Sequence, residues 1–406
     1  MTEPAWKGRS GAPTVIRGAA ILDVGSGETT VGDLGILDGV VVPVADLEQP
    51  MVVQADGLTV MFGLWDCHAH PGGLMHDPTA EGYFDGAADW TVRAGANLMN
   101  AARMGVTGVR AVAEADRVDL AWARAFAACT YPGPRLRCAG AGLRTTGGHG
   151  TAFPRRPVDV QWEWTVDGAD GMLRATRALI EQGVHWIKVM LTGGLDSAHE
   201  SIDDPQFTEA ELAAVMEAAG GRGVPVAAHC GSGRVAERFA LAGGRSIEHG
   251  YALDERAAAA MAEAGTWLVP TIGVTHDTAM MAADGWPEHA RTRAVEAAAR
   301  HAAALAACVA AGVRIATGAD LNPIGPRLHD ELRMLEVAGM DRLSVLRSAT
   351  TGGRALNGLG EHTVPEPGAA ADLILVDGDP LAEPELLRRP AGVFVYGRAV
   401  VDPASR

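Results

Sequence analysis

The sequence predicts an α/β fold, a (β/α)₈ TIM-type barrel joined to a small β-sandwich domain that both termini form. The first observation is that glycine-broken runs rich in Val, Ile and Leu occupy both ends of the chain. The second is that the long middle alternates strand-sized apolar runs with alanine-rich stretches of helical length. This alternation implies βα units and a parallel sheet. A barrel alone takes roughly 250 residues, so the 406-residue chain has room for one barrel and a small partner domain.

The two ends supply the predicted β-sandwich, residues 1–58 plus 362–406, and residues 59–361 supply the barrel. Short apolar pieces bounded by glycine are typical of antiparallel strands joined by tight turns. The terminal pieces that fit this description are residues 14–24, 35–43, 371–380 and 392–401.

The predicted barrel contains helical stretches at Ala87–Met104 and Ala121–Ala128. Compact apolar runs separate these and later helices, and each is short enough for a buried strand. The runs are residues 106–112, 186–190, 224–229, 246–249, 266–270 and 313–317.

Composition narrows the function classes. The net charge of −16 argues against a nucleic-acid or anionic-membrane partner, because both need concentrated Lys and Arg. No run approaches the ~18 apolar residues of a membrane span, and no signal-peptide pattern appears at the start of the sequence. Five cysteines without clustering suggest reduced thiols. We therefore expect a cytoplasmic protein.

Two histidines stand directly after the apolar run that opens the barrel. His68 and His70 are spaced i, i+2, which places both imidazoles on one face of a strand. A metal ion requires such convergence, since ring nitrogens must lie at roughly 2.0–2.1 Å from one point. The alternative is an alternating strand whose histidines share a solvated face.

Lys188 lies inside the strand-like run 186–190. An unpaired buried ammonium is costly, so this lysine needs a partner or a chemical modification. The alternative is a side chain that extends to the mouth of the barrel.

Three further strands end in polar residues, namely His229, His249 and Asp320. Taken singly, each histidine fits a hydrogen-bonded core residue, and the aspartate fits a helix cap. Taken with His68, His70 and Lys188, they form an ordered set at the strand ends, where barrel enzymes place their chemistry. The set predicts a metal site.

This ordered set resembles the amidohydrolase superfamily of metal-dependent hydrolases. The sequence is most similar to the imidazolonepropionase-like branch, which contains Xaa-Pro and Xaa-Arg dipeptidases and ochratoxin-hydrolysing amidases. The resemblance runs from about residue 14 to about residue 401. The matching motifs are residues 146–150, 186–190 with 192–194, 248–250, 337–340 and 371–380.

The resemblance implies a binuclear site with zinc as the expected metal. One divalent ion would be held by His68, His70 and Asp320, and the other by His229 and His249. Lys188, carboxylated on its ε-amine, would bridge the two ions. A carbamate is anionic, which also resolves the burial of the lysine.

The resemblance also implies the catalytic roles. A hydroxide that bridges the metals would attack the substrate, with its pKa lowered by coordination. Asp320 would take the proton and pass one to the leaving nitrogen. His149, on the glycine-rich loop 146–150, would polarise the substrate carbonyl; its alternative is an ordinary loop residue.

We therefore expect hydrolysis of a C–N amide bond in a small-molecule substrate, such as an N-acyl amino acid, a dipeptide or a related amide. A mononuclear aminohydrolase (deaminase) and a cyclic-amide hydrolase of the same superfamily are the alternatives. The deaminase branches carry a glutamate three residues after the strand-end histidine, and Ser232 stands there in this chain. A homo-oligomer is expected only by analogy with relatives.

Substrate selection is open at this level. Related dipeptidases often carry a tyrosine or histidine where Gly231 stands, so carboxylate recognition must come from elsewhere. Arg144, Arg155 and Arg156 are candidates for it, or else solvated surface charges. Trp162 and Trp164 with Phe153 fit either a pocket wall or a packing cluster, and His76 has no assigned role.

Overall fold

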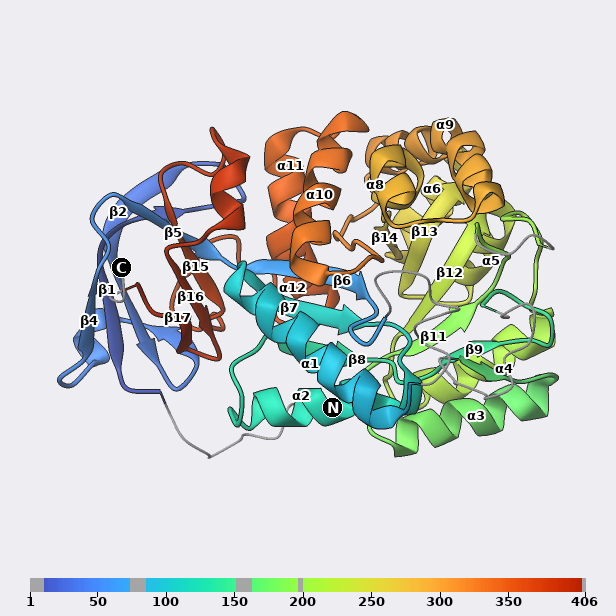
Figure 1. Ribbon diagram of the computed structural model, residues 1–406, viewed down its shortest axis with the longest axis horizontal. Helices are drawn as coiled ribbons and strands as arrows, with labels where there is room; N and C mark the ends of the chain where they lie inside the picture. Colours follow the sequence, from blue (N-terminus) through green and yellow to red (C-terminus); the bar gives the residue numbers. More distant parts are fainter. Residues whose placement is uncertain (1–10, 74–84, 151–162, 196–199, 404–406) are drawn as a thin grey trace.

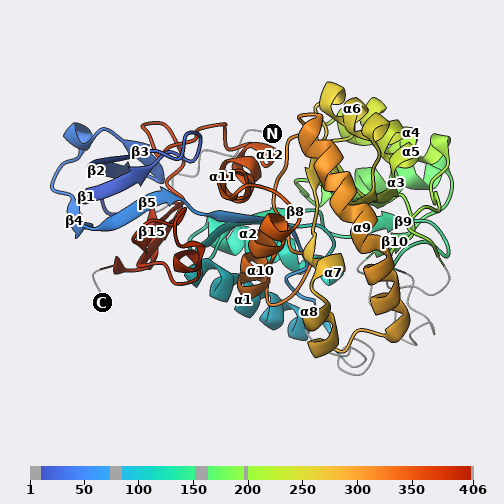
Figure 2. The same ribbon diagram turned by 90° about the horizontal axis from the view of Figure 1, so that it is seen from above.

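The computed structural model describes residues 11–73, 85–150, 163–195 and 200–403. A β-rich part, built from the first and last strands of the chain, lies beside a larger part of mixed helices and strands (Figures 1 and 2).

Strands from both ends of the chain pair in a single eight-stranded sheet. Its hydrogen-bonded order is β17-β16-β15-β5-β1-β2-β3, with β4 also paired to β1. The strands are β1 (Thr14–Leu22), β2 (Thr29–Leu37), β3 (Val40–Val42), β4 (Met51–Gln54), β5 (Leu58–Phe62), β15 (Leu373–Asp377), β16 (Gly392–Val395) and β17 (Arg398–Val401). The domain boundaries at 58/59 and 361/362 stay a prediction. The first of them assigns most of β5 to the barrel, whereas β5 pairs within the terminal sheet and β6 begins two residues after β5 ends.

The expectation of purely antiparallel pairing is wrong for part of this sheet. β1 pairs antiparallel with β2 but parallel with β4 and β5. The chain reverses between β1 and β2 and again between β2 and β3, so the strands that follow run in the direction of β1. Two reversals therefore explain the mixed sheet.

The strands of the larger part pair only in parallel, as the alternating pattern predicts. They form a three-stranded sheet in the order β6-β7-β8 and a six-stranded sheet in the order β10-β9-β11-β12-β13-β14. The strands are β6 (Leu64–Ala69), β7 (Val106–Ala111), β8 (Arg135–Cys138), β9 (Gly142–Arg144), β10 (Glu163–Thr165), β11 (Ile187–Met190), β12 (Val226–Ser232), β13 (Ser246–Ala252) and β14 (Trp267–Val269).

Backbone hydrogen bonds link these two sheets on both sides. The amides of His185 and Trp186 donate to the carbonyl of Cys138, which connects β8 with the start of β11. Residues 313–320 contact both β14 and β6: the Ala316 amide donates to Leu268, and the Cys67 amide donates to Thr317. The predicted strand 313–317 thus contributes one bridge, at Ile315, and not a full ladder. The part has the α/β architecture of a TIM-type domain.

The helices pack outside these strands (Figure 2). Several begin with the side-chain caps that their sequences predict; Thr208, for example, forms a capping box with Glu211 before α4. The helices are α1 (Ala87–Arg103), α2 (Val118–Ala127), α3 (Ala169–Glu181), α4 (Glu209–Gly220), α5 (Gly233–Leu241), α6 (Glu255–Ala264), α7 (Gly273–His276), α8 (Thr278–Ala283), α9 (Glu288–Ala310), α10 (Ile324–Val337), α11 (Arg342–Arg347) and α12 (Gly353–Leu356). Among the described residues, no helix has the length and apolar character needed to cross a bilayer.

An ion pair joins the larger part to the terminal sheet. Arg135 on β8 donates to Asp372, with an Nε–Oδ2 distance of 2.8 Å, and both side chains are buried. Asp372 also accepts the backbone N–H of Tyr396, and the Arg135 guanidinium stacks on the Tyr396 ring. Burial raises the pKa of Asp372, but the two neighbouring guanidiniums, Arg135 and Arg354, outweigh it and hold this pKa below its usual value.

We expect Arg135→Ala to destabilise the protein by about 3–5 kcal/mol, because the buried Asp372 carboxylate loses its partner. Urea unfolding followed by circular dichroism measures this change. Arg300→Ala, which removes an exposed ion pair with Asp203, is the matched control and should cost no more than about 1 kcal/mol. Equal losses in the two variants would contradict a special role for the buried pair.

Candidate active site

The six predicted metal ligands lie on neighbouring strands or directly after them. His68 is on β6, with His70 one residue beyond its end; Lys188, His229 and His249 are on β11, β12 and β13. Asp320 follows the segment that bridges β14 and β6, and its amide donates to the His68 carbonyl at 2.8 Å. The parallel strands end at one rim, so the side chains converge there.

The tightest group consists of His68, His70 and Asp320. Their ligand atoms lie within 4.8 Å of one another. The Oδ1 atom of Asp320 is 3.3 Å from Nε2 of His68 and 3.2 Å from Nε2 of His70. Two imidazole nitrogens and a carboxylate oxygen therefore face one point.

The outer nitrogens of these rings show that this group suits a metal ion. Nδ1 of His68 lies 2.8 Å from Oε2 of Glu248, and Nδ1 of His70 lies 2.9 Å from the carbonyl oxygen of Ala113. Both partners are acceptors, so each Nδ1 carries a proton, and in the neutral ring each Nε2 presents a lone pair. Lone pairs directed at a carboxylate oxygen repel it unless a cation lies between them. The donor set fits a divalent metal.

His229 and His249 lie beside this group. Their ring centroids are 4.5 Å apart, and the His249 ring is 4.8 Å from that of His68. Nε2 of His229 donates to the carbonyl of Gly193, and Nδ1 of His249 lies 2.7 Å from the hydroxyl of Thr271. The opposite nitrogen of each ring is the one able to bind a cation.

Lys188 is a buried residue whose charge acts on all of these groups. Its side chain is almost fully buried. Burial, with the Lys188 ammonium as the next cause, lowers the pKa of His68 to about 4. Burial, the neighbouring histidines and Lys188 together hold the pKa values of His229 and His249 well below the usual value. An unmodified ammonium thus opposes a second positive charge here, whereas an anionic derivative would favour it.

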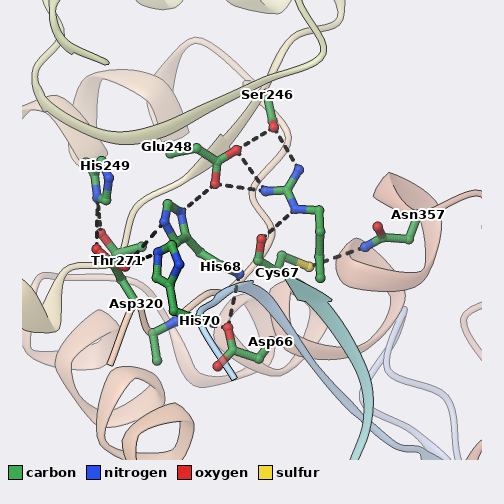
Figure 3. Close-up of polar contacts among 12 residues, drawn as sticks. Asp66, Cys67, His68, His70, Ser246, Glu248, His249, Thr271, Asp320 and Asn357 are labelled. Carbon is green, nitrogen blue, oxygen red and sulfur yellow. Dashed lines mark hydrogen bonds and ion pairs between the residues drawn. The ribbon is translucent and has the colours of Figure 1, made fainter. Parts of the chain in front are cut away.

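A buried salt bridge supports His68 from behind (Figure 3). Glu248 on β13 accepts two hydrogen bonds of 2.8 Å from Arg110 on β7 and a third from Nδ1 of His68. Arg110 also donates to Ser246 and to the Cys67 carbonyl, and its guanidinium stacks on Trp186. Glu248 stays ionised: burial opposes the charge, but Arg110 and His68 lower its pKa to about 2.

Three residues of the site have left-handed backbone conformations. The φ angles are +68° at His249, +60° at Asp320 and +47° at Thr271. Such angles are uncommon outside glycine, least so for Asp and His, and cost of order 1–3 kcal/mol each. His249 lies within β13, Thr271 lies two residues after β14, and Asp320 lies three residues after the segment 313–317.

His149 lies next to the predicted metal ligands. Its ring stacks on that of His229, with centroids 4.0 Å apart and planes inclined by 22°. Glu200 accepts a hydrogen bond of 2.8 Å from Nδ1 of His149. Burial raises the pKa of Glu200, but the hydrogen bond and the charge of His149 outweigh it and hold this pKa below its usual value.

Close packing explains three glycines near His149 and His229. A Cβ atom on Gly194 would lie 2.1 Å from the His149 ring, and one on Gly193 would lie 2.4 Å from the carbonyl of Ser201. A Cβ atom on Gly231 would lie 2.5 Å from the carbonyl of Ile202. The chain at residues 201–202 therefore occupies the place where a side chain at position 231 would begin.

The remaining sequence-based candidates have other positions. Arg144 donates to the hydroxyl of Thr165, and Trp164 packs against the main hydrophobic core. The packing interpretation therefore fits Trp164. The other candidates, Phe153, Arg155, Arg156, Trp162 and His76, lie outside the described residues.

Sequence reasoning missed the residues that support the ligands. Arg110 and Glu248 lie in apolar strands, so the argument applied to Lys188 would have identified them as buried charges in need of partners. Glu200 and Thr271 lie in loops without periodicity, and no sequence signal points to them. His301 on α9, whose Nε2 donates to the His249 carbonyl, was also missed.

Fold and site together define a class of protein, a TIM-type α/β domain with a candidate histidine–aspartate metal site at its rim. The model of the Amidohydrolase family matches residues 59–400. The chain belongs to this family and is a hydrolase that acts on carbon–nitrogen bonds.

Known relatives agree with this assignment. Ochratoxinase of Aspergillus niger is 29% identical over 357 residues, which cover 82% of this chain and 73% of that protein. A prolidase complexed with N-methylphosphonate-L-proline superposes with a TM-score of 0.86 at 29% identity, covering 95% of this chain and 99% of the other. A Xaa-Pro dipeptidase with bound methionine gives 0.85 at 27% identity, with 96% and 99% covered. They confirm the resemblance to the imidazolonepropionase-like branch.

The salt bridge behind His68 gives a test of the metal-binding group. We expect Glu248→Gln to weaken zinc binding by about 10- to 100-fold, because the carboxylate that orients His68 is lost. Competition with a chromogenic chelator measures the affinity. Ser246→Ala removes one neutral contact each of Glu248 and Arg110 but keeps the contacts of Glu248 with Arg110 and His68, so its affinity should stay close to that of the wild type. Unchanged affinity in Glu248→Gln would contradict the role assigned to the carboxylate.

Proposed function

We propose that this protein is a binuclear metal-dependent amidohydrolase, which cleaves the C–N amide bond of an N-acyl amino acid, a dipeptide or a related amide. The observation that carries the proposal is the convergence of His68, His70 and Asp320 beside His229 and His249, with Lys188 buried among them. The relatives named prolidase and Xaa-Pro dipeptidase support a dipeptide-like substrate. The proposal includes closure of the strands into a (β/α)₈ barrel.

Two divalent metal ions, with zinc as the expected metal, would supply Lewis acidity and lower the pKa of water. In this proposal His68, His70 and Asp320 would hold one ion, and His229 and His249 would hold the other. Lys188, carboxylated at its Nζ atom, would be the anionic ligand that the two ions share.

The protein's own residues then perform the proton and carbonyl chemistry. Asp320 carries its oxygens next to both groups, with Oδ2 3.8 Å from Nδ1 of His249. From this place it accepts the proton of the attacking water and delivers one to the leaving nitrogen. His149, stacked on His229 and bound to Glu200 through Nδ1, donates a hydrogen bond from a protonated Nε2 to the carbonyl oxygen of the substrate, so its ring is an imidazolium opposite the Glu200 carboxylate.

The absence of room at Gly231 bears on the substrate. No side chain can project from this position to bind a carboxylate, because the Ile202 carbonyl blocks it. We therefore propose that substrate recognition differs from that of relatives with a tyrosine or histidine there. We further propose that the substrate is a small molecule, that the protein is cytoplasmic and that it has no nucleic-acid or membrane partner. By analogy with relatives, we propose that it forms a homo-oligomer.

A mononuclear aminohydrolase is the alternative, and one observation favours it. Among the described residues, the compact group of acidic and histidine ligands contains only His68, His70 and Asp320, which suffice for one ion. A cyclic-amide hydrolase is a further alternative with the same ligands.

Metal content and substrate screening separate these functions. We expect about two zinc equivalents per chain in the fully loaded protein and turnover of members of an N-acyl amino acid and dipeptide library. One equivalent together with release of ammonia from aminated heterocycles would favour the mononuclear alternative. Two equivalents with turnover confined to cyclic amides would favour the cyclic-amide hydrolase.

Lys188 gives a second test. We expect Lys188→Ala to lose metal and activity together, because the bridging anion is gone, and to regain part of both with added short carboxylic acids. Elemental analysis and amide hydrolysis measure the two properties. Lys188→Arg keeps a long cation that cannot form a carbamate and should remain inactive. An alanine variant with full metal content and full activity would contradict the carbamate.

A further inference from the structure

A closed set of hydrogen bonds holds His149 in place. Its Nδ1 donates to Oε1 of Glu200, and its backbone N–H donates to Oε1 of Gln206, both at 2.8 Å. The amide nitrogen of Gln206 then donates to the second oxygen of Glu200, also at 2.8 Å. Side chain and backbone of His149 are thus fixed by two residues that contact each other.

These two residues belong to one anchored segment, residues 200–206. The backbone N–H of Gln206 donates to the carbonyl of Leu191, and the backbone N–H of Gly193 donates to the carbonyl of Asp204. The segment is therefore attached to the chain directly after β11. The Thr145 hydroxyl donates to the Gln206 carbonyl and connects the segment to the loop that carries His149. Glu200 therefore lies on a segment that is held by hydrogen bonds to the chain at the rim of the site.

The contact with Glu200 determines which way the imidazole faces. The His149 ring lies between His229, on which it stacks, and Gly194, where no Cβ would fit. Within this slot the ring has two orientations, related by a half-turn. Only one places Nδ1–H on the Glu200 carboxylate, and it directs Nε2 to the opposite side. The other orientation would place a carbon atom against the carboxylate.

We propose that Glu200, supported by Gln206, is a positioning residue that sets the ring orientation of His149 and so directs Nε2 toward the carbonyl oxygen of the substrate. This inference rests on the proposed function, in which His149 acts on that carbonyl. Glu200 does not touch the substrate and acts only through His149.

A double-mutant cycle on the zinc-loaded protein tests the proposal with an amide found in the library. We expect His149→Ala to lower kcat by about 100-fold, as for loss of one donor to a developing oxyanion. Glu200→Ala should lower kcat by about 10-fold or more with little change in KM. The double variant should be no slower than His149→Ala, because Glu200 has nothing left to position. Glu200→Gln keeps an acceptor oxygen and should recover part of the loss.

Asp203→Asn is the matched control. Asp203 lies on the same segment, and its exposed ion pair with Arg300 does not involve His149. This variant should keep the kcat of the wild type. Multiplicative losses in the double variant, or an equal loss in Asp203→Asn, would overturn the proposal.

Nuclear magnetic resonance of ¹⁵N-labelled histidines tests the same point without turnover. We expect the His149 signals, assigned by their loss in His149→Ala, to show protons on both Nδ1 and Nε2 in the wild type and an altered state in Glu200→Ala. Unchanged signals would overturn the positioning role. If the wild type hydrolyses no amide while these signals change as expected, the proposed function fails and the role of Glu200 in orienting the ring stands.

Discussion

The carboxylate of Glu248 joins parts of the structure that no β-ladder connects. It lies on β13 of the six-stranded sheet and binds Arg110 and His68, which lie on β7 and β6 of the three-stranded sheet. A buried ion pair gains little net stability over an apolar core, but removal of one partner is costly. The contribution of this carboxylate is geometric. It links the two sheets through side-chain hydrogen bonds, and it determines which nitrogen of His68 faces Asp320.

The rest of the site repeats this arrangement. Each histidine at the rim has one nitrogen engaged by a fixed acceptor or hydroxyl: Ala113 for His70, Gly193 for His229 and Thr271 for His249. Left-handed backbone at His249, Thr271 and Asp320 completes the orientation. The surrounding core meets the conformational cost of these residues.

The sequence predicted the α/β class and the order of the ligands because both depend on local patterns. An apolar run ending in His229 or His249 is visible in the sequence, and so is a lysine inside a strand. Contacts between distant loops leave no such pattern, which is why Glu200 and Thr271 were missed. The parallel pairing of β1 with β4 and β5 was also missed, because the sequence of one strand does not show how often the chain reverses before the next strand pairs with it. Arg110 could have been predicted from the sequence as a buried, paired residue, because a charge inside an apolar run needs a partner.

The sheet that unites both chain ends has a consequence for synthesis on the ribosome. β5 pairs with β15, which lies more than 300 residues later, and continues almost directly into β6. During translation the first five strands emerge with one sheet edge uncovered, and this edge stays uncovered until nearly the whole chain has been made. Unpaired edges of this kind promote association between nascent chains. Correct folding of this enzyme in a cell therefore depends on how the newly made amino-terminal strands are shielded while the remainder is translated.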